Sequence, residues 1–328
     1  MIVAVLLGGR SSEHEVSLRS GASVASGLRT AGHEVVEIRI SRDGRWSAGG
    51  EEVELRAGGG LVGADVAFPV LHGPFGEDGS VQGTLETLDV AYAGPGVLAA
   101  AVAMDKLVFK RLLAYEGLPQ VEFCAVGEDG WRERVAAMGR PLWVKPSRLG
   151  SSVGISKVSG GEAELDAAIA AATAHDPRVI VEAHCRWPEV ECSVIGNSTV
   201  AGAPVETSLP GLIAYPGSDW YDFEAKYSDG AMRLEVPAPI GDSAVALVRE
   251  LAERVYRLID GTGLARCDFF VSPDGEVLVN EINTIPGFTV TSVFGKLFEA
   301  SGVAYPDLCD RLVRLALERH TAERAFEF

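Results

Sequence analysis

The sequence predicts a mixed α/β fold in which an opening β-α-β unit precedes further units of strands and helices. The first observation is the apolar run at residues 2–7, which is followed by a helical apolar pattern and then by a strand pattern at 34–40. The second is the stretch 265–292, where two β-branched and aromatic runs flank a turn. The third is the length of 328 residues, enough for two or three domains with a substantial core.

The composition is typical of a globular enzyme, with 47% hydrophobic and 23% charged residues. No apolar run approaches the roughly 18 residues of a membrane helix, and the first strand has no basic flank or cleavage site. The net charge of −17 argues against nucleic acid or an anionic membrane as partner. The five cysteines are scattered and form no C-x-x-C pair, so we expect reduced thiols in a cytoplasmic protein.

The opening unit ends its first strand in the loop GGRSS at 8–12 and continues into a helix. Both the G-x-G-x-x-G fingerprint and the P-loop pattern are absent, which argues against a dinucleotide-dependent dehydrogenase. Glu15 lies at the start of the helix. A carboxylate there can interact with the helix dipole or bind a cationic amine, and the residues alone leave both roles open.

A second Gly-rich loop, LHGPFGEDG at 71–79, follows the predicted strand 66–70 and contains His72 and two acidic residues. Ligands bind at the carboxyl ends of strands in α/β folds, so we predict that His72 has a functional role. The Gly-Pro-Gly sequence at 94–96 marks a domain boundary.

The middle of the chain carries the pattern of a phosphate site. The predicted strand 142–146 enters a Gly/Ser loop at 147–154, and Lys145 lies at its entry. Backbone N–H groups of such a loop can cradle phosphates while the ammonium group supplies charge. Downstream, two short apolar strands are joined by the hinge 183–188, which can accept an adenine ring, with Glu189 placed for ribose hydroxyls.

The segment 209–230 is long, punctuated by Gly and Pro, and rich in aromatic residues. A loop of this length in a compact domain is usually a lid or a binding loop. Lys226 and Tyr227, near its end, are candidates to reach into the site that it covers.

The predicted hairpin near the C-terminus supplies a candidate metal site. Residues two apart on a strand share a face, so Arg266 lies with Asp268 and Glu281 lies with Asn283. A turn at 272–275 brings Asp268 and Glu281 within a residue or two of register. Two carboxylates and an amide oxygen suit Mg²⁺, although a salt-bridged surface hairpin has the same residues. The Gly-containing segment after Asn283, where backbone N–H groups can approach a ligand closely, favours a phosphoryl-transfer site over a surface hairpin.

Seven motifs, in order along nearly the whole chain, resemble those of the D-alanine–D-alanine ligases of the ATP-grasp superfamily. They are GGRSSEHEVSLRSG (8–21), HGPFGEDGSVQG (72–83), MDK (104–106), KPSRLGSSVG (145–154), YDFEAKY (221–227), ARCDF (265–269) and NEINTIPGFTVTS (280–292). The resemblance implies an ATP-grasp fold preceded by a Rossmann-like N-terminal domain. It implies three domains, at 1–97, 98–184 and 185–328, and a homodimer.

The resemblance also implies how ATP and metal are bound. ATP would lie between the central and C-terminal domains, and two Mg²⁺ (or Mn²⁺) ions would neutralise charge during γ-phosphoryl transfer. The implied ATP contacts are Lys106, Lys145 and Lys226 with the phosphates, the hinge at Glu182 and Ala183 with adenine, and Glu189 with ribose. The implied metal ligands are Asp268, Glu281 and Asn283.

Two molecules of D-alanine are the implied substrates. The carboxylate of the first would become an acyl phosphate, and the amine of the second would attack it to give D-alanyl-D-alanine for peptidoglycan synthesis. The implied contacts are Glu15, linked to Ser151 and Tyr227, for the first ammonium group, Arg266 and the Gly287 backbone N–H for the oxyanion, Ser292 for the second carboxylate, and His72 near the substrates.

Other functions remain open at this point. A relative that makes D-alanyl-D-lactate or D-alanyl-D-serine would share most motifs, and Tyr227 in EAKY favours the dipeptide enzyme. A nucleotide-binding protein without ligase activity would be expected to lack Arg266, Glu15 or a metal ligand, and all are present. The chain departs from the family pattern at Leu149, where a polar residue is common, and at 187–188, where Trp-Pro replaces a usual Gly.

Overall fold

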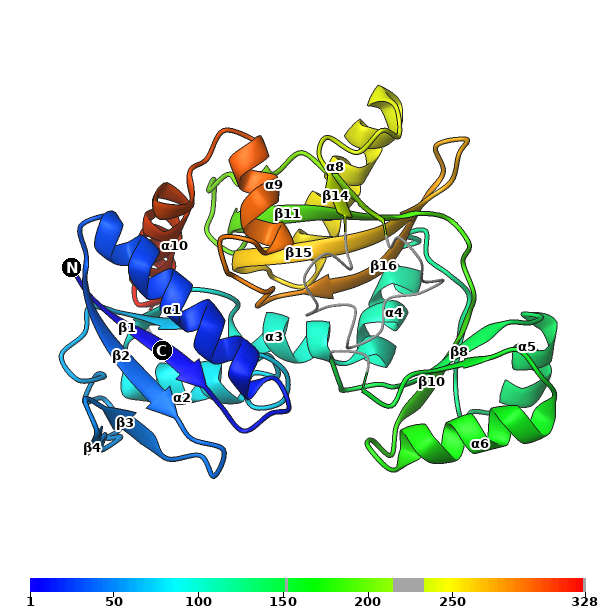
Figure 1. Ribbon diagram of the computed structural model, residues 1–328, viewed down its shortest axis with the longest axis horizontal. Helices are drawn as coiled ribbons and strands as arrows, with labels where there is room; N and C mark the ends of the chain where they lie inside the picture. The colour runs from blue at the N-terminus through cyan, green and yellow to red at the C-terminus, as the bar shows by residue number, and fades with distance from the viewer. Residues whose placement is uncertain (151–152, 215–232, 327–328) are drawn as a thin grey trace.

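The computed structural model describes residues 1–150, 153–214 and 233–326. These residues form three β-sheets that lie next to one another, with helices packed on them (Figure 1). Within the described ranges, no helix is long and apolar enough to cross a membrane. All five cysteines lie in these ranges and are free thiols.

The first sheet has the order β4-β3-β2-β1-β5-β6. Its strands are β1 (Ile2–Gly8), β2 (Glu34–Ile40), β3 (Trp46–Ala48), β4 (Glu51–Glu52), β5 (Val66–Pro69) and β6 (Ala91–Tyr92). β1 runs parallel to β2 and β5, which confirms the predicted β-α-β opening. Val3 and Val5 pack in the cluster that contains α1 (His14–Thr30), whereas Ala4 and Leu6 pack in the cluster that contains α2 (Ser80–Leu88). Both faces are therefore buried, which explains the unbroken apolar run.

The second sheet is antiparallel, with the order β7-β10-β8-β9. Its strands are β7 (Phe123–Ala125), β8 (Leu142–Pro146), β9 (Ser156–Val158) and β10 (Val179–Ala183), and its helices are α5 (Trp131–Ala137) and α6 (Glu162–Thr173). Alternate residues of β8, Leu142 and Val144, pack in the core that contains α6. Trp143 and Lys145 therefore point to the opposite face, where both line a pocket.

The third sheet is also antiparallel, with the order β14-β13-β11-β15-β16 and β12 paired to β11. Its strands are β11 (Glu189–Asn197), β12 (Val205–Thr207), β13 (Gly211–Ala214), β14 (Arg233–Glu235), β15 (Thr262–Val271) and β16 (Val277–Asn283). Val190 and Cys192 of β11, and Ala265 and Cys267 of β15, pack in the core that contains α8 (Asp242–Leu258). The intervening polar residues of both strands consequently lie on the other face.

The β15–β16 hairpin has the predicted turn. Gly275 adopts φ +86°, and its N–H donates to the carbonyl of Ser272 at 3.0 Å. Asp268 lies directly opposite Glu281, and Arg266 lies directly opposite Asn283. The two residues thus lie within the residue or two of register that the turn predicts. A bulge between Asp268 and Phe269 sets the exact pairing, because a regular ladder from the turn would place Asp268 opposite Asn280.

The remaining helices connect the sheets. They are α3 (Val97–Met104), α4 (Lys106–Tyr115), α9 (Val293–Ala300) and α10 (Tyr305–Glu323). α10 returns to the first sheet, where Leu308 and Leu312 share a core with Val3 and Val24 (Figure 1). Residues from both ends of the chain thus build one core, and the domain division at 97 and 184 remains a prediction.

Candidate active site

A pocket of about 1160 Å³ is lined by residues of the second and third sheets and by the helix and loop next to the first sheet. Its walls come from α1 and the His72 loop, from α4 and β8, and from β11, β15, β16 and the segment 284–293. This volume is slightly larger than the roughly 300–1,000 Å³ of typical small-molecule sites, so the pocket has room for more than one ligand. Most of the predicted site residues line it: His72, Lys106, Lys145, Glu182, Ala183, Glu189, Arg266, Glu281, Asn283, Gly287 and Ser292.

The hairpin cluster forms one wall. Arg266 donates to both carboxylate oxygens of Asp268, at 2.7 Å each, and its Nε lies 2.9 Å from Glu191 of β11. The Asn283 amide donates to Asp268 at 3.0 Å. Glu191 can reach Arg266 because it lies directly opposite Asp268 in the β11–β15 pairing. The guanidinium is thus held between two carboxylates, with its side chain 17% exposed towards the pocket.

The oxygen atoms of the same wall are of the kind that bind a divalent cation. Glu281 and Asn283 line the pocket, and Asp268 lies directly behind, only 1% exposed. Among the residues that the structure describes, no group of three or more His, Cys, Asp or Glu is placed to hold a metal ion. Two carboxylates and an amide oxygen without a complete protein cage suit Mg²⁺, which takes its other ligands from phosphates and water.

A buried ion triad forms the opposite wall. The Glu182 carboxylate lies 2.6 Å from Lys145 Nζ and 3.2 Å from Lys110 Nζ. Burial alone would raise the pKa of Glu182, but the two ammonium groups lower it to about 2. Burial lowers the pKa of Lys110, whereas for Lys145 the attraction of Glu182 and Glu281 outweighs burial and raises the pKa. Lys145 therefore stays cationic beside the acidic hairpin.

The N-terminal wall contains a carboxylate that the sequence analysis misplaced. Glu15 does not line the pocket: its side chain is 70% exposed and lies 3.2 Å from Arg42. Glu13, two residues earlier, lines the pocket and is 7% exposed. A Cβ at Gly73 would lie 3.0 Å from a Glu13 carboxylate oxygen, so Glu13 packs against the His72 loop. The structure therefore contradicts the placing of Glu15 in the site and puts Glu13 there.

Helix geometry explains the correction. α1 begins at His14, so Glu15 is on its first turn and faces solvent, whereas Glu13 precedes the helix. The Ser11 hydroxyl accepts from the Glu13 N–H at 3.2 Å and donates to the His72 carbonyl at 2.7 Å. These bonds fix the residue before the helix against the neighbouring loop and direct its side chain inward.

Glu77 and His72 complete this wall. Glu77 accepts from the Gly73 N–H at 2.7 Å, and burial, reinforced by the nearby charge of Glu13, raises its pKa to about 8. Burial lowers the pKa of His72, although Glu13 opposes the shift. A neutral His72 donates from Nδ1 to the Ile285 carbonyl at 3.0 Å, which leaves Nε2 as an acceptor, 3.4 Å from the Ser20 hydroxyl. The His72 loop is thus tied to the segment that carries Gly287.

The segment 284–292 is held by aromatic packing and by a tight turn. Phe288, 1% exposed, stacks on Phe68 with ring centroids 6.0 Å apart, and its carbonyl accepts from Tyr305 at 2.7 Å. Ser292 Oγ accepts from the Thr289 N–H at 3.0 Å. Anchored in this way, Gly287 presents its backbone to the pocket.

Three predicted residues, Ser151, Lys226 and Tyr227, lie outside the described residues. Sequence reasoning also missed Glu13, Glu77, Lys110 and Glu191 as site residues. The spacing in the sequence could have predicted two of them. Lys110 follows Lys106 by four residues and so shares its helix face, and Glu191 follows Glu189 by two and so shares its strand face.

Comparisons with known protein families match most of the chain. The family described as D-ala D-ala ligase N-terminus matches residues 2–59 and 50–95, and D-ala D-ala ligase C-terminus matches residues 112–314. A D-alanine–D-alanine ligase from an Arthrobacter species is 43% identical over 98% of this chain and 95% of its own length. One from Deinococcus radiodurans is 43% identical over 96% and 98%.

Solved structures agree with this match. The D-alanine–D-alanine ligase from Coxiella burnetii superposes with a TM-score of 0.87 and 31% identity, covering 99% of this chain and 96% of that one. The VanG D-Ala:D-Ser ligase from Enterococcus faecalis superposes with a TM-score of 0.84 and 31% identity, covering 96% and 99%. The predicted α/β, ATP-grasp fold class is thereby confirmed. By sequence and by structure, the chain belongs to the D-alanine–D-alanine ligase family.

Proposed function

We propose that this protein joins two D-alanine molecules into D-alanyl-D-alanine at the expense of ATP, which becomes ADP and phosphate, as a step in peptidoglycan precursor synthesis. One observation carries the proposal: in one pocket a wall with Lys106 and Lys145 faces an acidic hairpin with Glu281, and Glu13 lies at a third side. The lysines complement the charge of a phosphoryl donor, the acidic hairpin that of a metal ion, and Glu13 that of an ammonium group. The curated relatives, 43% identical over nearly the whole chain, support the same activity.

ATP would be held across the second and third sheets. Lys106, Lys145 and Lys226 are assigned to its phosphates, and Glu189 to its ribose. The carboxylate of Glu182 is engaged by two lysines, so its contribution to adenine, like that of Ala183, would come from the backbone of the hinge. The side chain of Glu182 instead keeps Lys145 charged and in place.

Asp268, Glu281 and Asn283 are assigned to two Mg²⁺ or Mn²⁺ ions. When bound, the metal neutralises charge on the transferring phosphoryl group. Asp268 can serve as a ligand once Arg266 gives up one of its two contacts to it. Glu191 still holds the guanidinium through its 2.9 Å ion pair, so Arg266 remains at the pocket surface.

The substrates would react in two steps. A carboxylate oxygen of the first D-alanine attacks the γ-phosphorus and releases ADP, which forms an acyl phosphate. The amine of the second attacks the acyl carbon, loses a proton, and displaces phosphate. Glu13, with Ser151 and Tyr227, would hold the first ammonium group, and Ser292 the second carboxylate. Arg266 and the Gly287 N–H would stabilise the oxyanion, and neutral His72 would position the substrates.

A D-serine or D-lactate acceptor is the alternative. The fold does not separate these activities, because the VanG D-Ala:D-Ser ligase and the Coxiella burnetii D-alanine–D-alanine ligase are both 31% identical to this chain. The curated relatives near 43% identity favour D-alanine.

The proposal also includes a cytoplasmic location, a homodimer and three domains, at 1–97, 98–184 and 185–328. Five free thiols support a reducing compartment. Sedimentation equilibrium would test the dimer, and limited proteolysis would test the domain boundaries.

Phosphate release from ATP, with products identified by mass, tests the activity. We expect Mg²⁺-dependent release with D-alanine alone, accompanied by the dipeptide, and none with L-alanine. Glu281→Gln should abolish turnover without unfolding the protein, because it removes a metal-binding charge. If phosphate is released only when D-serine or D-lactate is added, the acceptor is that molecule and not D-alanine. Full activity of Glu281→Gln would refute the metal assignment.

A further inference from the structure

Next to the two phosphate-side lysines lies a polar cluster, which we call the Asp105 cluster and which consists of the buried residues Asp105 and Ser147 and the partly exposed Arg178. None of the three lines the pocket. Ser147 is fully buried, and Asp105 is 7% exposed. Asp105 caps α4 by accepting from the Val108 N–H at 3.2 Å, accepts from the Ser147 hydroxyl at 2.7 Å, and forms an ion pair with Arg178.

Ser147 is the centre of the cluster because all its polar groups are used. Its N–H donates to the Arg178 carbonyl at 2.9 Å, and its carbonyl accepts from the Lys106 N–H at 2.9 Å. Its hydroxyl accepts from the Leu107 N–H at 3.1 Å while donating to Asp105. One residue therefore joins the end of β8, the start of α4 and the chain entering β10.

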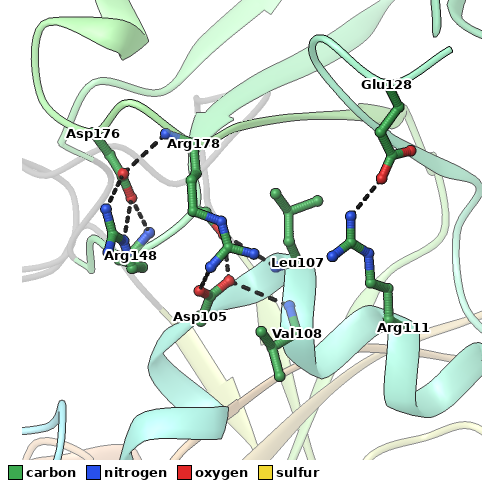
Figure 2. A network of polar contacts seen from close by, with 9 residues as sticks. Asp105, Leu107, Val108, Arg111, Glu128, Arg148, Asp176 and Arg178 are labelled. Carbon is green, nitrogen blue, oxygen red and sulfur yellow. Dashed lines mark hydrogen bonds and ion pairs between the residues drawn. The ribbon is translucent and has the colours of Figure 1, made fainter.

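A second pair, Asp176 and Arg148, extends this network through Arg178 (Figure 2). Asp176, 3% exposed, accepts from the Arg148 backbone N–H at 2.8 Å and from its guanidinium at 2.7 and 3.1 Å. It also accepts from the Arg178 N–H at 3.0 Å. Ser147 and Arg148, the first residues of the loop after β8, are thus bonded to the start of α4 on one side and to Asp176 on the other.

The lysines are directly attached to this network. Lys106 follows Asp105, and Lys145 lies two residues before Ser147. Lys106 Nζ donates to the Leu149 carbonyl at 2.8 Å, so its side chain also holds the loop. A displacement of α4 relative to β8 would separate the two ammonium groups. The Asp105 cluster opposes it at the start of α4, whereas the ion pairs of Lys110 and Lys145 with Glu182 oppose it one turn further along.

We infer that the Asp105 cluster is a positioning device that sets Lys106, Lys145 and the loop 147–150 in register for the triphosphate of ATP. The inference rests on the proposed function and adds positioning residues to it. Because the cluster acts only through groups that face phosphate, it should affect phosphate binding and leave adenosine binding unchanged. A cluster that merely stabilises the fold would not separate the two.

The test compares Ser147→Ala and Arg178→Ala with the wild-type enzyme. We expect the Kd for ATP to rise about tenfold, since the variants lose hydrogen bonds that hold the phosphate-facing lysines and loop in place. The inhibition constant of adenosine and the KM for D-alanine should change less than about twofold, as expected for sites whose own contacts are intact. Arg178→Lys, which keeps the charge, should recover most of the ATP affinity.

Glu128→Gln is the matched control. It removes the charge that pairs with Arg111 on α4, shown in Figure 2, and with Arg134, and neither partner is a site lysine or a residue of the loop 147–150. Its ATP affinity should equal that of the wild type. If Ser147→Ala fails to fold, Arg178→Ala carries the test, because that side chain is 36% exposed.

An equal loss of ATP and adenosine affinity would overturn the inference, and so would a lowered melting temperature with unchanged ATP affinity. Wild-type protein that binds no ATP would instead reject the proposed function, and the inference with it. Full ATP affinity in the wild type and in both alanine variants would reject the inference alone.

Discussion

At the scale of single residues, the site depends on which carboxylate a short loop directs inward. Glu13 and Glu15 are chemically identical and two positions apart, and the helix start at His14 separates them. The Ser11 hydroxyl fixes Glu13 through the His72 loop, a contact between residues 61 positions apart. No local pattern in the sequence reveals such a contact.

The two glutamates make a matched pair for mutagenesis. Glu13→Gln should lower kcat/KM for D-alanine by about 10–100-fold, because a buried charge-assisted bond to the ammonium group is lost. Glu15→Gln should stay within about twofold, because an exposed ion pair contributes little. Steady-state kinetics at saturating ATP measure both. A severe loss in Glu15→Gln with an active Glu13→Gln would reverse the assignment.

At the scale of elements, the period of the strands accounts for the site. Residues of β8, β11 and β15 alternate between a packed core and the pocket, so their polar positions follow from their apolar ones. The face shared by Arg266 and Asp268 was predictable from their spacing, and the turn at Gly275 predicted that Asp268 lies within a residue or two of Glu281. The exact register was not predictable, because it depends on a bulge between Asp268 and Phe269. The pairing of β11 with β15, which brings Glu191 to Arg266, was also not predictable, because the paired residues lie between 65 positions (Asn197 and Thr262) and 81 positions (Glu189 and Phe270) apart. Short strands such as β3 and β4 carry too few residues for a period.

The ion triad between β8, β10 and α4 makes a prediction about stability and pH. Glu182→Gln should destabilise the fold by about 3–5 kcal/mol, because two ammonium groups are left without their shared carboxylate. Adding Lys110→Met should recover part of the loss. The free energy of unfolding from urea titrations measures both effects.

The pH dependence has a defined sign. The pKa of Glu182 is lowered from 4.5 to about 2 in the folded state, so its contribution is fully present above pH 4.5. It is lost as the pH falls towards 2, and the difference between wild type and Glu182→Gln should narrow over that window. A difference that is constant from pH 7 to pH 3 would contradict the buried carboxylate.

At the scale of the whole molecule, α10 connects the first sheet to the third. α10 packs with β1 and α1, and its buried Arg319 donates to the Gly94 carbonyl and to Thr262, both at 2.9 Å. The connector at 94–96 and the start of β15 are thereby fixed to the first sheet. The bond from His72 to the Ile285 carbonyl joins the same two parts at the pocket.

The transfer of labelled oxygen tests the central claim, that this pocket joins D-alanines through an acyl phosphate. D-alanine labelled with ¹⁸O in its carboxylate is turned over with ATP and Mg²⁺, and the released phosphate is analysed by mass. Attack of the carboxylate on the γ-phosphorus, followed by displacement of phosphate by the amine, predicts one labelled oxygen in phosphate for each dipeptide formed. Phosphate that contains no label, formed together with dipeptide, would contradict the mechanism.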